Sequence, residues 1–130
     1  MAMNPSRPWN EIAHCEGTTS IATTPVAAQI ICTNAGYLER VFASAAGTTT
    51  GTITVAVSLN GGSDLCNSLL LIPAGTGARA GASYEWPMNI SVGQTTSPTY
   101  INEGDTITFT PSGGTGASIG GAFTAIIRTI

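Results

Sequence analysis

The stretch TITVAVSL, from Thr52 to Leu59, alternates apolar with small or polar side chains from end to end. Successive side chains of a β-strand point to opposite faces, so this rhythm places Ile53, Val55 and Val57 on one face together with Leu59. Its β-branched residues also favour strands. The stretch therefore predicts a strand with one face in a core and the other face outside.

Turn residues interrupt similar β-rich segments along most of the chain. The further predicted strands are residues 19–24, 26–33, 37–43, 65–72, 84–92, 100–101, 105–110 and 122–129. Clusters of Gly, Asn and Pro separate them at intervals of roughly eight to twelve residues, which is typical of sandwiches and barrels. We expect an all-β fold of about eight strands, an antiparallel β-sandwich that is jelly-roll-like. The order of the strands is not encoded in their periodicity.

The composition excludes some classes of partner. Charged residues make up 8% of the 130 residues, the net charge is −3 and the four Arg are scattered. Nucleic-acid binding needs clustered Lys and Arg, so no nucleic-acid partner is expected. No apolar stretch is long enough to span a membrane, and the first residues lack the apolar core of a signal peptide. We expect a chain made in the cytoplasm that has no membrane partner.

Residues 1–17 differ in composition from the sandwich domain predicted over residues 18–130. Proline lacks an N–H donor and restricts the residue before it, so this segment is predicted to form an extended N-terminal arm. Trp and Arg are the side chains that most often anchor an interface. The residues expected to contact a sister subunit or a partner are Pro5, Arg7, Pro8 and Trp9.

Three groups of residues resemble metal sites only loosely. Cys15, Cys32, Cys66 and the single His14 lack the close spacing of zinc ligands, and reduced, partly buried thiols are the expected state. Residues 60–64 and 102–105 offer loop oxygens, but each loop has too few carboxylates for calcium, and turn chemistry explains them. We expect no metal-binding residues.

Catalytic patterns are equally weak. The glycines of residues 75–81 precede a predicted strand, whereas a phosphate-binding loop needs a helix next. Glu85 lies between Tyr84 and Trp86, which point to the other side of the strand. We expect no catalytic residue, no cofactor and no enzyme activity. An unrecognised site using Glu85, His14 or Asp105 remains the enzyme alternative.

The chain resembles the small decoration, or cement, proteins of tailed-bacteriophage heads. The similarity consists of the proline-containing arm, the strand within residues 51–62 and the segment EGDTITFT over residues 103–110. It implies a structural virion protein that binds the outer surface of a capsid, at junctions between major capsid proteins, as a trimer. The resemblance assigns no functional residue, and the expectation that Pro5, Arg7, Pro8 and Trp9 contact the capsid or a sister subunit depends on the composition of the arm. The alternative is a carbohydrate-binding or receptor-binding β-sandwich module of a phage head or tail fibre.

Overall fold

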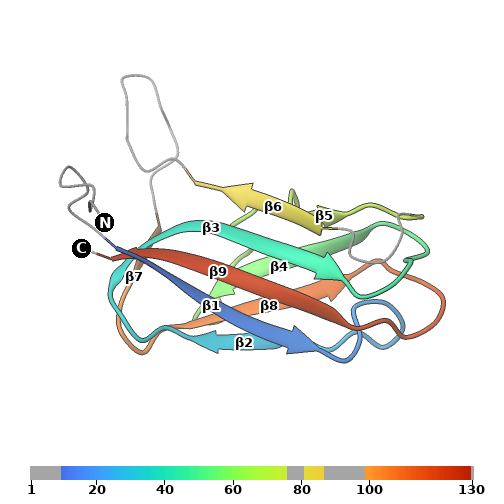
Figure 1. Ribbon diagram of the computed structural model, residues 1–130, viewed down its shortest axis with the longest axis horizontal. Helices are drawn as coiled ribbons and strands as arrows, with labels where there is room; N and C mark the ends of the chain where they lie inside the picture. The colour runs from blue at the N-terminus through green and yellow to red at the C-terminus, as the bar shows by residue number, and fades with distance from the viewer. Residues whose placement is uncertain (1–9, 76–80, 87–98, 130) are drawn as a thin grey trace, which may run out of the picture.

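The computed structural model describes residues 10–75, 81–86 and 99–129, which form two antiparallel sheets packed face to face (Figure 1). Within these residues there is no helix. The strands are β1 (Glu11–Thr18), β2 (Ala28–Ile31), β3 (Gly36–Ala45), β4 (Ile53–Leu59), β5 (Leu71–Ile72), β6 (Gly81–Glu85), β7 (Thr99–Ile101), β8 (Thr106–Ser112) and β9 (Gly121–Thr129). The predicted fold class, an all-β antiparallel sandwich, is confirmed.

The strand pairing is nested, with early strands beside late ones. One sheet has the order β1-β9-β3, and β6 and β7 both pair with the far edge of β3. The other sheet has the order β2-β8-β4-β5. The chain thus pairs β1 with β9, β2 with β8, β3 with β7 and β4 with β5. This arrangement makes most contacts long-range in sequence.

The core lies between the two sheets and follows the two-residue alternation. Ile53, Val55 and Val57 are fully buried, as their spacing predicts. The rings of Phe109 on β8 and Phe123 on β9 stack across the two sheets, with centroids 4.9 Å apart and planes 10° apart. Burying such a side chain stabilises the fold by roughly 1.5–3 kcal/mol, so these residues dominate the packing.

Several predicted strands are shorter in the structure, or absent. Of residues 65–72 only Leu71–Ile72 is a strand, because the backbone turns at Asn67 and Ser68, which have positive φ angles of 49° and 62°. Residues 19–24 form bends rather than a strand, although Ile21 is buried. The strand expected over residues 84–92 is represented by β6, and residues 87–98 lie outside the described part of the chain.

Residues 11–17, the C-terminal part of the expected N-terminal arm, belong to the sandwich instead. Residues 11–17 belong to β1, which pairs with β9 over its whole length, from Glu11 opposite Arg128 to Thr18 opposite Gly121. The prolines that suggested an arm all precede this strand, and residues 11–17 contain none, so every backbone N–H there can pair. Pro5, Arg7, Pro8 and Trp9 lie outside the described residues.

Candidate functional site

The outer face of the four-stranded sheet is uncharged. We call it the threonine face and define it by the outward side chains of its strands: Gln29, Ile31, Thr54, Ala56, Ser58, Leu71, Thr106, Thr108, Thr110 and Ser112. Ile31 is 67% exposed, a large fraction for an aliphatic side chain. None of these outward side chains is ionisable, although His14 and Glu16 of the neighbouring strand line a hollow with Gln29 and Ile31 at the edge of the face. Away from that edge, these side chains present no like charges to oppose the approach of a second surface.

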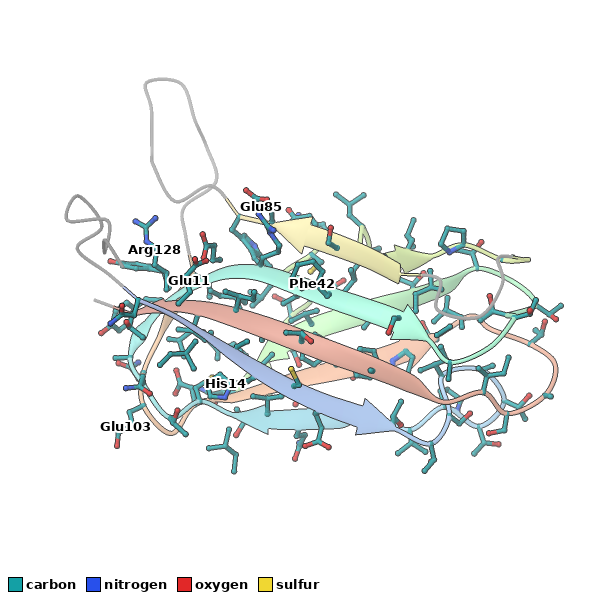
Figure 2. The ribbon with its side chains drawn as sticks, viewed as in Figure 1. Glu11, His14, Phe42, Glu85, Glu103 and Arg128 are labelled. Carbon is teal, nitrogen blue, oxygen red and sulfur yellow. The ribbon has the colours of Figure 1, made fainter. Side chains whose placement is uncertain are left out.

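The outer face of the five-stranded sheet holds a shallow hollow of about 400 Å³ beside Phe42. We call it the Phe42 hollow; it is lined by Phe42, Ala43, Ser44, Gly81, Ala82, Ser83, Ala122 and Thr124. Figure 2 shows Phe42 near the middle of this face. The lining residues that the structure describes supply one aromatic ring and three hydroxyl groups, and none of them is ionisable.

An ion pair between Arg40 and Glu85 lies beside Phe42. The guanidinium of Arg40 lies 5.7 Å from the centre of the Phe42 ring. Its Nη2 donates a hydrogen bond of 2.7 Å to Oε2 of Glu85, which faces it on β6. Both side chains are substantially exposed, so the pair itself contributes little to stability. It orients Arg40 over the ring.

Two carboxyl groups lie close together at the end of this face. A bulge in β3 makes Glu39 the extra residue, because Leu38 faces Ile127 while Arg40 faces Ile126. Burial, followed by a hydrogen bond with and repulsion from the Glu11 carboxyl, raises the pKa of Glu39 to about 7. Arg128 and Arg40 oppose this shift. Figure 2 shows Glu11 and Arg128 together at this end.

The Glu39 carboxyl makes folding stability depend on pH near neutrality. In the unfolded chain it titrates near 4.5, so between 4.5 and about 7 the folded state binds more protons. Stability should therefore fall as the pH rises through this window, and Glu39→Gln should flatten the fall. Urea unfolding at pH 5, 6, 7 and 8 measures it. Glu103→Gln, which removes an exposed carboxyl group, is the matched control. An equal slope in wild type and Glu39→Gln would contradict the prediction.

His14 and the cysteines occupy separate positions. Cys15 faces outward beside Thr124, with the Sγ and Oγ1 atoms 3.4 Å apart. The neighbouring His14 has a buried Nε2 that finds no hydrogen-bond partner among the described residues. Cys32 and Cys66 are buried, and burial raises the pKa of both thiols, that of Cys66 to about 12. Such thiols are poor nucleophiles. The described residues contain no cluster of three or more metal-ligating side chains.

The two loops considered for calcium have structural roles instead. Oδ1 of Asp64 accepts hydrogen bonds from the N–H groups of Val57 and Cys66, each 3.0 Å, and Oδ2 accepts one of 2.8 Å from Ser68. These bonds account for the turn that shortens β5. The carboxylate oxygens of Asp64 are thus already engaged.

The fold also joins the two loops to each other. The Asn60 amide donates to Oδ1 of Asp105 at 3.0 Å, and its own oxygen accepts a bond of 2.9 Å from the Thr106 N–H. The bond from the Asn60 amide, together with one from the Asn102 N–H to Asp105 Oδ2, lowers the pKa of Asp105. Asn and Asp at these positions therefore serve turn geometry, as turn chemistry alone predicted.

The remaining candidate residues are the aromatics around Glu85, Glu85 itself and the glycines of residues 75–81. Trp86 is 2% exposed and packs edge-to-face against Tyr84, with centroids 4.8 Å apart, so these aromatics belong to the core. Glu85 is on the outer face, paired with Arg40. Of the glycines in residues 75–81, Gly81 begins strand β6 and residues 76–80 lie outside the described chain.

Comparison with known proteins gives no indication of function, so function is inferred from the geometry of the chain. No protein-family model matches the chain, and no curated protein or solved structure matches it either. No helix long and apolar enough to cross a membrane occurs in the described part of the chain. The Phe42 hollow and the carboxyl pair were not found by sequence reasoning, because both depend on which strands pair.

Proposed function

We propose that the chain is a structural virion protein that decorates a bacteriophage capsid as a homotrimer, on its outer surface. The observation that carries the proposal is the threonine face, a sheet surface whose outward side chains are all uncharged and include an exposed Ile31. Threonine and serine hydroxyls both donate and accept hydrogen bonds, so they adapt to backbone groups of a partner. Binding to a shell requires area and complementarity rather than a reactive group.

The size of the threonine face supports a role for the arm as well. The four strands β2, β4, β5 and β8 have 4, 7, 2 and 7 residues. At about 4.8 Å between strands and about 3.3 Å per residue they cover roughly 300 Å² in plan. A stable interface buries about 800 Å² per partner, so this face needs additional contacts. Residues 1–9, which contain Arg7 and Trp9, are the proposed source of those contacts.

We also propose that the sandwich is a jelly roll. The nested pairing of β1 with β9, β2 with β8, β3 with β7 and β4 with β5 supports this, since a jelly roll is a long hairpin wrapped into two sheets. Strand β6 is then an addition at the edge of β3. Jelly rolls are common in viral capsid domains and in lectins, so the fold type by itself leaves the function open.

Sedimentation with capsids tests the proposed function. Purified chain should sediment with expanded heads that lack their decoration protein, prepared from the phage that encodes it, and should have the mass of a trimer. Thr108→Arg puts a desolvated charge on the threonine face and should weaken binding at least about tenfold. Ala13→Arg, an outward change on the opposite sheet, is the matched control. If wild-type protein stays in the supernatant, the proposal is wrong.

A further inference from the structure

The outer surface of the five-stranded sheet is uneven, because outward side chains of neighbouring strands line up in rows of different height. One outward row across four strands consists of Cys15, Thr124, Phe42 and Ser83, and the next consists of Gly17, Ala122, Ser44 and Gly81. The second row has no side chain longer than serine. The surface therefore drops from the Phe42 ring to a floor of small residues, and this step is the Phe42 hollow.

The wall of the hollow is the aromatic ring of Phe42. Phe42 is half-buried, and Arg40 lies over it from the row on the side away from the floor. Glu85 pairs with the guanidinium of Arg40. An aromatic side chain has only two χ angles, so it loses little conformational entropy when a ligand packs against it, which favours binding.

The floor and sides offer hydroxyl groups. Among the described residues, Thr124 Oγ1 has only the weak Cys15 Sγ partner, and no hydrogen bond engages the Ser44 or Ser83 hydroxyl. Each hydroxyl is both a donor and an acceptor. A ligand with its own hydroxyl groups can satisfy them in either direction.

The chemistry of the lining selects one class of ligand. A charged ligand would lose hydration without meeting an opposite charge, because none of the described residues that line the hollow is ionisable. A purely apolar ligand would desolvate the three hydroxyls without replacing their hydrogen bonds. A pyranose ring has an apolar C–H face for Phe42 and equatorial hydroxyls for the floor, and a volume of about 400 Å³ can hold one sugar unit.

We propose that the Phe42 hollow binds a single uncharged sugar residue of a glycan. Phe42 stacks on the sugar ring, and the hydroxyl groups of Ser44, Ser83 and Thr124 form hydrogen bonds with the hydroxyls of the sugar. The site is separate from the threonine face and lies on the opposite sheet. The chain would then attach to a shell with one face while the other face remains open to a glycan.

Saturation-transfer NMR with free sugars tests this site. The probes are the methyl glycosides of glucose, galactose, mannose and N-acetylglucosamine, each added alone to the full chain. At least one should bind with about millimolar affinity, since an open hollow buries only part of its ligand. Phe42→Ala should weaken binding about tenfold. Ser44→Leu, which fills the hollow and keeps Phe42, should abolish it.

The controls separate the possible explanations. Tyr100→Ala removes an aromatic side chain that is 45% exposed elsewhere on the same face, and it should leave binding unchanged. Cyclohexanol has a similar ring with one hydroxyl and should bind far more weakly than the glycosides. The proposal is overturned if none of the four glycosides binds, if cyclohexanol binds equally well, or if Ser44→Leu still binds. Because no capsid is used, failure here leaves the proposed virion role untouched.

Discussion

Replacing Phe109 by alanine is expected to lower the free energy of unfolding by about 3–5 kcal/mol. The ring is fully buried and stacks on Phe123 of the opposite sheet, so its removal leaves a cavity between the two sheets. The surrounding strands cannot close this cavity, because backbone hydrogen bonds on both sides hold β8 in place. Urea unfolding of wild type and variant at one protein concentration measures the difference.

Thr110→Ala is the matched control for the Phe109 variant. Thr110 is on the same strand, exposed on the outer face, and its truncation should change stability by no more than about 0.5 kcal/mol. Phe109→Leu should give an intermediate loss. Equal losses for Phe109→Ala and Thr110→Ala would mean that β8 does not bury the face assigned here.

Replacing Asp64 by alanine is expected to cost about 2–4 kcal/mol. The side chain accepts hydrogen bonds from three backbone N–H groups, those of Val57, Cys66 and Ser68. Val57 and Cys66 are completely buried, so water cannot fully replace the carboxylate there. Thermal unfolding and hydrogen exchange of the Val57 and Cys66 amides measure the effect.

Two variants define the cause of the Asp64 effect. Asp64→Asn keeps an oxygen that can accept from Val57 and Cys66 and should recover more than half of the loss. Glu103→Gln removes an exposed carboxylate from the turn before β8 and should be nearly neutral. If Asp64→Asn is as unstable as Asp64→Ala, the charge rather than the hydrogen-bonded turn stabilises this segment.

The alternation in residues 52–59 predicts strand, burial and outer face correctly, because these depend only on neighbouring residues. Residues 65–72 look equally apolar, yet they form a turn. The reason is that the Asp64 carboxylate accepts hydrogen bonds from backbone N–H groups on both sides of it in the sequence. Residues 11–17 looked like an arm because nothing local shows that β9, more than a hundred residues later, pairs with them. The pairing of strands that are distant in sequence cannot be predicted from the local pattern of residues.

The candidate sites also depend partly on local sequence and partly on long-range strand pairing. The amino-acid order by itself determines that Phe42 and Ser44 lie on one face of a strand, and that Glu39 and Glu11 are ordinary carboxylic acids. Only the nested pairing of strands decides that Gly81 and Ala122 lie beside Ser44, opening the hollow, and that the bulge in β3 brings Glu39 to Glu11. The physical reason is that a strand specifies its two faces from its own residues, whereas its neighbours are chosen by the packing of the whole chain.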